Sequence, residues 1–285
     1  MTRIFLAGAT GVVGRRLVPR LVAGGHAVTA LTRRTADVEA LRAQGVEAVV
    51  GDVFDADSLR AAVVAAGPEV VMQQLTDLAG LDFAANARLR KVGTRNLVDA
   101  AQAAGARRFV VQSIAWAYEA GDEPASEGTP LDVDAESERR RGTVDAVRTM
   151  EELAATLPEY VVLRYGTLYG PGTWYAPDGL TVEQVRSGQV VANADVSSFL
   201  HVDDAAGAAV ESLGWPSGAV NVVDDTPAPA SEWVPAFARA AGLAGPEPVS
   251  AERTGWARGA DNSYARKELG WTPQHSSWRE GFGSA

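Results

Sequence analysis

Residues 4–14 read Ile-Phe-Leu-Ala-Gly-Ala-Thr-Gly-Val-Val-Gly, a short apolar run that ends in a glycine-rich turn. The apolar run is typical of a strand that is buried on both faces. In the following residues, 12–23, apolar side chains recur every four positions, which is helical spacing. The three glycines therefore join a buried strand to a helix, the order that begins a strand–helix–strand unit.

The same alternation continues outward from this turn. Further strands are expected at residues 26–32, 46–50, 69–73 and 107–112, and further helices at 37–43, 58–66 (with Asp57 as N-cap) and 83–104. Apolar strands that alternate with helices predict a parallel sheet covered on both faces. We therefore expect an α/β fold: a doubly wound, Rossmann-type dinucleotide-binding domain over residues 1–165. Beyond it glycines and prolines become frequent, which predicts a smaller, intimately packed substrate-binding lobe over residues 166–285.

The glycine turn carries the first chemistry. Gly8 permits a tight turn, Gly11 lets the backbone approach a pyrophosphate, and Gly14 lets the helix pack close to the strand. The helix that follows offers free N–H groups and the positive end of its dipole to phosphates. The turn therefore predicts a nicotinamide dinucleotide cofactor, bound also by the intervening residues Thr10, Val12 and Val13.

The end of the second strand distinguishes between the two nicotinamide cofactors. An NAD site places an acid there for the ribose 2′-hydroxyl, but this chain has Arg33 and Arg34. Two guanidinium groups fit a 2′-phosphate, although a solvated arginine pair is the alternative. We predict NADP(H), with NAD(H) less favoured. Asp52 and Val53, after the third strand, are expected to contact the adenine.

Composition excludes several classes of protein. The formal net charge of −10 argues against nucleic-acid binding and against a polybasic membrane anchor. There is no cysteine, and the three histidines are far apart in sequence, so we expect no metal site. The N-terminus lacks the features of a signal peptide, and no apolar run approaches the ~20 residues that span a bilayer. We expect a cytoplasmic protein whose partner is a small-molecule substrate.

Several motifs resemble one known family. They are Gly8-x-x-Gly11-x-x-Gly14, residues 51–53 (Gly-Asp-Val), 93–98 (Gly-Thr-Arg-Asn-Leu-Val), 163–171 (Leu-Arg-Tyr-Gly-Thr-Leu-Tyr-Gly-Pro) and 201–205 (His-Val-Asp-Asp-Ala). Together they resemble the NAD-dependent epimerase/dehydratase group, the extended short-chain dehydrogenases/reductases. The resemblance implies a homodimer formed through helices near residues 83–104 and 143–157. It also implies cofactor contacts from Gln73, Gln74, Leu75, Ser113, Tyr165, Gly166, Thr167 and Leu168.

The chain departs from this family at its catalytic dyad. The family uses a tyrosine and, four residues later, a lysine that lowers the tyrosine pKa. Here no tyrosine lies between Tyr118 and Tyr160, and the only lysines are Lys91 and Lys267. Counting back from Glu151 or Glu152 places the tyrosine slot at Thr143 or Val144, and the lysine slot at Val147 or Arg148. The helper serine slot falls at Ile114. The chain is therefore identified as an atypical member.

If the reaction transfers a proton, residues other than this dyad must donate or accept it. The catalytic candidates are Ser113, Tyr165 and Thr143, although Tyr165 fits simple packing and Ser113 fits a hydrogen bond at a strand end. His201 fits a helix-capping role better than a catalytic one, and Arg148 could hold an anion or a ribose hydroxyl, or lie on a solvated helix face.

Three aromatic residues, Trp116, Trp174 and Tyr175, are expected to line an apolar substrate pocket, with ordinary packing as the alternative. Three functions stay open. The first is an NADP(H)-dependent oxidoreductase on a small carbonyl or hydroxyl compound. The second is an epimerase, isomerase or lyase with non-standard acid/base residues, and the third is a non-catalytic NADP(H)-sensing protein.

Overall fold

The computed structural model describes residues 1–78 and 80–282. These residues divide into two compact units, and each unit is described by itself. The first unit comprises Met1–Ser113, Val133–Leu163 and Ala206–Ala219, and the second comprises Ile114–Asp132, Arg164–Ala205 and Val220–Ala285. The expected boundary after residue 165 lies close to residues 163–164, where the chain passes from the first unit to the second. The chain also passes between the units at other positions, so neither unit is one continuous segment.

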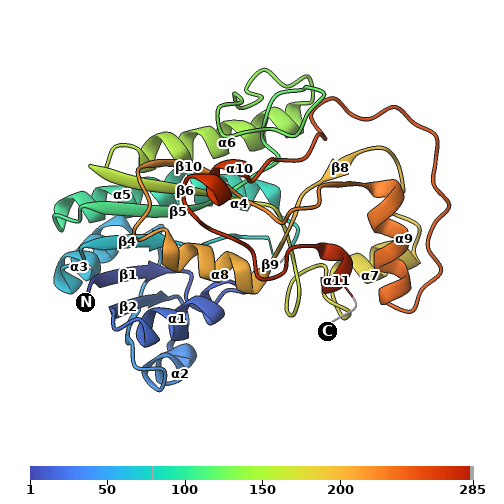
Figure 1. Ribbon diagram of the computed structural model, residues 1–285. Coiled ribbons are helices and arrows are strands. Elements are labelled where there is room, and N and C mark those ends of the chain that lie inside the picture. Colours follow the sequence, from blue (N-terminus) through green and yellow to red (C-terminus); the bar gives the residue numbers. More distant parts are fainter. Residues whose placement is uncertain (79, 283–285) are drawn as a thin grey trace. The chain divides into compact units, whose positions relative to one another are not determined.

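A seven-stranded sheet forms the framework of the fold, in the order β10-β6-β5-β4-β1-β2-β3 (Figure 1). The strands are β1 (Arg3–Ala7), β2 (Ala27–Thr32), β3 (Glu47–Val50), β4 (Val70–Gln73), β5 (Arg108–Ile114), β6 (Glu159–Tyr165) and β10 (Gly218–Val222). The pairings from β3 across to β5 are all parallel. The order runs outward in both directions from β1 and β4, as in a doubly wound sheet. The predicted Rossmann-type α/β fold is confirmed.

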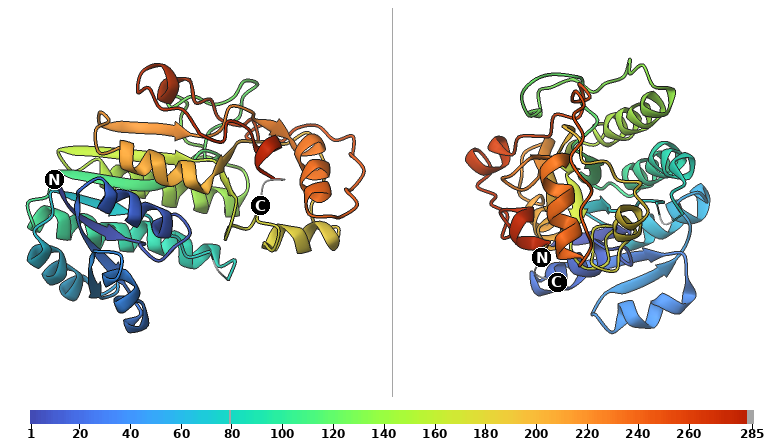
Figure 2. Two further views of the ribbon diagram at one scale, coloured as in Figure 1. Left: turned by 60° about the horizontal axis from the view of Figure 1, so that its bottom comes forward. Right: turned by 90° about the vertical axis from the view of Figure 1, so that its right-hand side faces the viewer.

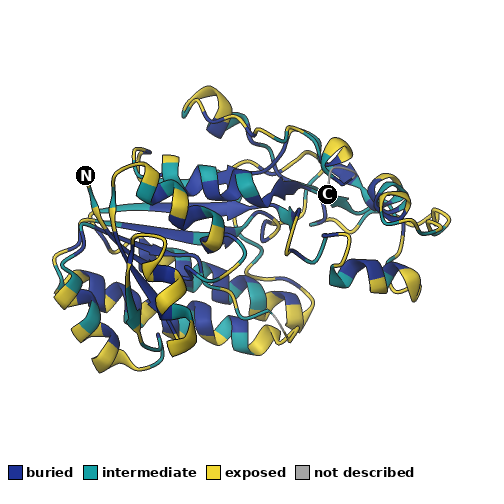
Figure 3. Ribbon diagram, turned by 90° about the horizontal axis from the view of Figure 1, so that it is seen from below, coloured by how far each residue is buried: buried dark blue, intermediate teal, exposed yellow. Residues whose placement is uncertain are grey.

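Helices cover this sheet because its strands are apolar on both faces. They are α1 (Gly14–Ala23), η1 (Thr35–Asp37), α2 (Val38–Arg42), α3 (Ala56–Ala66), α4 (Phe83–Arg88), η2 (Leu89–Gly93), α5 (Thr94–Ala103), α6 (Glu138–Ala154) and α8 (Val202–Glu211). Phe5 of β1 packs with residues of α3, α5 and α6 in one core cluster. Leu6 points to the opposite face because side chains alternate along a strand. Figure 3 shows the result: buried strands, and helices whose outer faces are exposed.

Two helices differ from the sequence prediction. The N-cap of α3 is Asp55, whose carboxylate accepts a hydrogen bond from the Ser58 backbone N–H at 3.2 Å, so the expectation of Asp57 was wrong. Asp57 instead lies in the first turn, where its charge complements the helix dipole. The helix expected at residues 83–104 is present, but the π-helical turn η2 interrupts it. Such turns are rare and frequently mark functional sites.

The second unit holds two small sheets and an aromatic core. β7 (Thr167–Tyr169) pairs with β9 (Phe199–His201), and β8 (Val196–Ser197) pairs with β11 (Ala228–Pro229). Its other helices are α7 (Leu180–Arg186), α9 (Ala230–Ala240), α10 (Ser263–Lys267) and α11 (Trp278–Gly281), with α7 and α9 side by side (Figure 2). No helix in the described part of the chain is long and apolar enough to cross a membrane.

Candidate functional site

The glycine turn between β1 and α1 fits a dinucleotide. A Cβ on Gly8, whose φ is +104°, would lie 2.5 Å from the Gln74 carbonyl oxygen, and a Cβ on Gly14 would overlap the Gly8 carbonyl. These two glycines are therefore required by the protein's own packing. Gly11 is exposed, and a Cβ there would meet only the Gly8 oxygen at 3.3 Å and the Gln74 oxygen at 4.0 Å. The open space over Gly11 is where a pyrophosphate approaches the backbone.

The other predicted cofactor residues surround this turn in the first unit. Thr10 and Val12 are half-buried beside it, and Val13 is buried at the start of α1. The Asp52 carboxylate accepts from the Phe54 backbone N–H at 2.9 Å, and the Val53 carbonyl accepts from the Asn96 side chain at 2.8 Å. Gln74 donates its backbone N–H to the Ala7 carbonyl, and Leu75 follows it. These residues gather at the carboxyl ends of the strands, where dinucleotides bind in such sheets.

The side chain of Gln73, at this edge of the sheet, has an acceptor without a partner among the described residues. Its side-chain nitrogen donates to the Thr94 hydroxyl at 2.9 Å. Its side-chain oxygen is buried and has no hydrogen-bond partner within the described residues. A buried acceptor without a partner is costly, and a bound molecule that donates a hydrogen bond would remove the cost.

Arg33 and Arg34 differ in their surroundings. Arg34 forms a bidentate ion pair with Asp37, with nitrogen–oxygen distances of 2.6 and 2.9 Å, and this hydrogen bonding lowers the pKa of the Asp37 carboxyl. Thr32 also donates to Asp37 at 2.9 Å, which fixes the carboxylate. Arg33 is exposed and forms no ion pair within the described ranges. Of the two arginines predicted to contact a 2′-phosphate, Arg33 is therefore the one that has no ion pair with the described residues.

We expect the substitution Arg33→Ala to raise the dissociation constant of NADPH about tenfold and to leave that of NADH within twofold. A charge-assisted pair with a phosphate is worth roughly 1.5 kcal/mol, and NADH has no group in that position. Calorimetric titration with both cofactors measures this, with Arg42→Ala, an exposed arginine of α2, as the matched control. An equal loss for both cofactors would contradict the 2′-phosphate assignment.

The predicted catalytic residues of the first unit are held by other groups. The Ser113 hydroxyl is fully buried and donates to a Glu151 carboxylate oxygen at 2.6 Å. With Glu151, which faces β5, taken as the family's glutamate, the expected tyrosine slot is Thr143 and the expected lysine slot is Val147. The Thr143 hydroxyl donates to the Arg139 carbonyl of its own helix at 3.1 Å, and Val147 is fully buried. Neither slot carries a group that transfers protons near neutral pH.

Two arginines near this position have opposite surroundings. Arg148 pairs with Asp145 at 2.7 Å and with Glu152 at 2.8 Å on the partly exposed face of α6. Arg90, on the π-helical turn η2, is only 7% exposed. Burial lowers the pKa of Arg90 to about 10, although the charge of Glu151 acts in the opposite direction. Sequence reasoning missed Arg90, because an arginine within a predicted helix gives no signal of burial.

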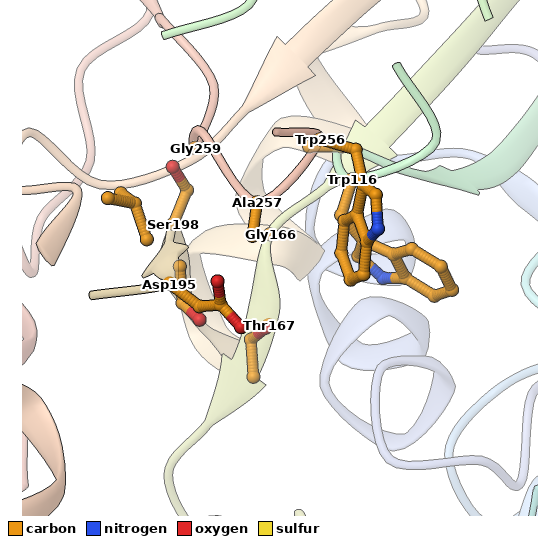
Figure 4. Close-up of a pocket in the computed structure, with 11 residues that line it drawn as sticks. Trp116, Gly166, Thr167, Asp195, Ser198, Trp256, Ala257 and Gly259 are labelled. Atoms are coloured by element: carbon orange, nitrogen blue, oxygen red, sulfur yellow. The ribbon is translucent and has the colours of Figure 1, made fainter. Parts of the chain in front are cut away.

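The second unit contains a cavity of about 230 Å³ (Figure 4). Its lining is made of Ala115, Trp116, Gly166, Thr167, Asp195, Val196, Ser197, Ser198, Trp256, Ala257 and Gly259. The ring centroids of Trp116 and Trp256 are 6.4 Å apart, and Figure 4 shows both indoles on one side and Asp195 on the other. Asp195 is the one ionisable residue of the lining. Its carboxylate accepts from the Thr254 backbone N–H at 2.7 Å and from the Asn193 side chain at 3.0 Å.

The remaining predicted residues of the second unit lie around or away from this cavity. Gly166 and Thr167 line it, and Leu168 follows on β7. The Tyr165 hydroxyl is buried and donates to the Ala205 carbonyl at 3.0 Å. Trp174 and Tyr175 are not among the lining residues, and the Tyr175 ring packs against Phe199, Trp233 and Phe237. No pattern in the sequence indicates that Trp256 and Asp195 lie beside Trp116.

Histidines that are far apart in sequence do meet in this unit. The rings of His201 and His275 stack with centroids 3.7 Å apart, and a potential ligand atom of Asp204 lies within 4.8 Å of theirs. Both Asp204 oxygens accept backbone hydrogen bonds, from Gln274 and His275. Nδ1 of His201 accepts from the Asp203 backbone N–H at 3.2 Å at the start of α8, so the predicted capping role is confirmed. These contacts give the group a structural role, and we propose no metal there.

The buried carboxyl of Asp224, near Asp204, should make the stability of the folded protein depend on pH. Asp224 is 1% exposed, and burial raises its pKa from 3.8 to about 7, against hydrogen bonds from the Thr226 and Trp278 backbones. Between about pH 4 and pH 7 the folded state therefore keeps a proton that the unfolded state releases. Stability should fall by about 2–4 kcal/mol as pH rises through this window and change no further above it. Urea midpoints from pH 4.5 to 8 should show this slope, and Asp224→Asn should flatten it. An equal slope in the variant would assign it to other groups.

Comparisons with known proteins agree with this geometry. A family model described as NAD(P)H-binding matches residues 8–201. A relative from a Streptomyces species, named 3-diazoavenalumate denitrifying reductase, is 47% identical over 306 aligned residues, which cover 99% of each chain. The ceramide reductase of Caulobacter vibrioides is 29% identical over 71% of this chain and 58% of its own.

Solved structures share the fold at low identity. WbmG of Bordetella bronchiseptica, in complex with NAD and UDP, has a TM-score of 0.76 at 23% identity, covering 99% of this chain and 93% of its own. The UDP-glucose 4-epimerase of Thermotoga maritima has a TM-score of 0.74 at 19% identity, covering 98% and 96%. These structures share the predicted Rossmann-type fold. The chain belongs to the NAD(P)H-binding family.

Proposed function

We propose that this protein is a reductase that uses NADPH to replace a diazo group on an aromatic ring by hydrogen, with release of N2. One observation carries the proposal: the cofactor turn is complete, whereas Thr143 and Val147 occupy the slots of the family's proton-transferring dyad. The relative that aligns over 99% of both chains is named a denitrifying reductase of a diazo compound, which supports the same reaction here.

The chemistry explains why the dyad is dispensable. Reduction of a carbonyl needs a proton as well as a hydride, because the oxygen that stays bonded to carbon must be protonated to a hydroxyl group. Reduction of an arenediazonium, ArN2+ + NADPH → ArH + N2 + NADP+, needs only the hydride that bound NADPH supplies. The C–N bond breaks, a C–H bond forms, and the hydride neutralises the positive charge. The protein then has only to bind, orient and shield the two reactants.

The cavity of the second unit fits an aromatic cation. The faces of Trp116 and Trp256 offer apolar surface and the negative face of their π-systems. Asp195 supplies a carboxylate that no cation of the described chain neutralises. A flat ring with a positively charged substituent therefore matches both halves of the lining, and an anionic group at this position would be repelled.

The test is turnover of 4-hydroxybenzenediazonium with NADPH. We expect one NADPH consumed for each N2 and each phenol formed, and a primary kinetic isotope effect with NADPH deuterated at C4. A reaction without protein corrects for spontaneous reduction. Turnover of ketones or aldehydes but not of the diazonium would favour the carbonyl oxidoreductase. Turnover of a substrate without net NADPH consumption would favour an epimerase, and binding without any turnover would favour a sensor.

The proposed enzyme also has a proposed assembly. We propose a homodimer through the helices near residues 83–104 and 143–157, where Phe83 and Val92 are large exposed apolar side chains. Sedimentation measures the mass in solution, and a monomer at working concentration would refute the dimer.

A further inference from the structure

Arg90 is a buried cation whose guanidinium has no hydrogen-bond partner among the described residues. Its side chain is 7% exposed on the π-helical turn η2, and it forms no hydrogen bond or ion pair within residues 1–78 and 80–282. A guanidinium carries five N–H donors and stays charged at neutral pH. The guanidinium nitrogens are not among the fully buried atoms that lack a partner, so the group reaches solvent, where a bound molecule can supply the acceptors.

The groups around Arg90 belong to the cofactor edge of the first unit. Thr94 follows one turn later and holds the side chain of Gln73, the last residue of β4. The charge of Glu151 acts on Arg90, and Glu151 accepts from Ser113 near the end of β5. Arg90 is therefore associated with the carboxyl ends of β4 and β5, at the edge where this type of sheet binds its dinucleotide.

We propose that Arg90 binds the hydroxyl oxygens of the nicotinamide ribose. A ribose diol both accepts and donates hydrogen bonds, so it can accept from the Arg90 guanidinium and donate to the Glu151 carboxylate or the Gln73 oxygen. A carboxylate or phosphate could only accept, and Glu151 would repel it. This residue would anchor the nicotinamide half of the cofactor in a chain whose lysine slot is Val147.

The experiment measures cofactor binding without substrate, so it is independent of whether diazo reduction occurs. For Arg90→Met we expect the dissociation constant of NADPH to rise at least tenfold by calorimetry. The dissociation constant of 2′,5′-ADP, which lacks the nicotinamide ribose, should stay within twofold. Arg90→Lys keeps the charge but loses the planar set of N–H donors, so its dissociation constant for NADPH should lie between those of wild type and Arg90→Met. Arg95→Met, an exposed arginine five residues later, is the matched control and should bind both ligands normally.

Thermal unfolding separates binding from folding. Without cofactor, Arg90→Met should melt at or above the wild-type temperature, because it removes a buried charge that has no hydrogen bonds. A lower melting temperature together with equal losses for NADPH and 2′,5′-ADP would make Arg90 a structural residue and overturn the proposal. Unchanged NADPH binding would also overturn it. So would a rise confined to the KM of the aromatic substrate, which would assign Arg90 to that substrate.

Discussion

Gly11→Ala should raise the dissociation constant of NADPH at least thirtyfold while leaving the fold intact. The new Cβ would meet only the Gly8 oxygen at 3.3 Å and the Gln74 oxygen at 4.0 Å, and the φ of Gly11 does not lie in the left-handed region. The methyl group would occupy the space through which a pyrophosphate reaches the backbone N–H groups of the turn. Calorimetry with NADPH and 2′-phospho-ADP-ribose, which keeps the pyrophosphate, measures the loss, which should be similar for both ligands.

Two other glycines supply the controls for this experiment. Gly207→Ala on α8 meets no atom within 4 Å, so it should bind NADPH normally and melt at or slightly above the wild-type temperature. Gly14→Ala would overlap the Gly8 carbonyl, so it should unfold at a much lower temperature. If Gly11→Ala lowers the melting temperature as Gly14→Ala does, its role is in packing. If it binds NADPH normally, the turn is not the phosphate site.

The framework of the fold could be predicted because it depends on local patterns. β1 to β5 are short apolar runs, and the apolar residues of α1 recur every four positions. These patterns predict a parallel sheet in which each strand is followed by a helix. The glycine turn depends on residues that are adjacent in the chain. The prediction of Asp57 as the N-cap of α3 was wrong because Asp55, two residues earlier, is a second aspartate that precedes the same run of helix-forming residues. Only the backbone geometry shows which of them caps the helix.

The site could be predicted only where neighbours in sequence are neighbours in space. Asp37 lies three residues beyond Arg34, yet nothing in the pattern showed that it would neutralise that arginine and leave Arg33 available. Trp256 reaches Trp116 across 140 positions of the chain, and tertiary packing alone brings them together. Arg90 and the exposed Arg95 both lie within the helix predicted at residues 83–104, and only the structure shows which of them is buried.

Asp195→Asn should abolish a preference of the second unit's cavity for aromatic cations. The probes are 3-hydroxyphenyltrimethylammonium and 3-tert-butylphenol, which have nearly the same shape and differ in one central atom, a charged nitrogen or a neutral carbon. We expect wild type to bind the cation at least tenfold more tightly than the phenol, because the Asp195 carboxylate lies in a partly enclosed cavity with two indole faces. In the variant the dissociation constant of the cation should rise about tenfold, which corresponds to about 1.4 kcal/mol of binding free energy, and that of the neutral phenol should be unchanged.

The asparagine variant separates charge from architecture. Its side-chain oxygen can still accept from the Thr254 backbone N–H, which holds the loop, whereas the negative charge and the hydrogen bond from the Asn193 side chain are lost. Asp178→Asn, an exposed change of the same charge in the same unit, controls for the net charge of the protein. Calorimetry at two salt concentrations should show a smaller cation preference at high salt, as expected for a partly exposed carboxylate. If wild type binds both probes equally, Asp195 only orders the loop. A diazonium substrate would then have to be held by the indoles alone, and the same variant should leave its KM unchanged.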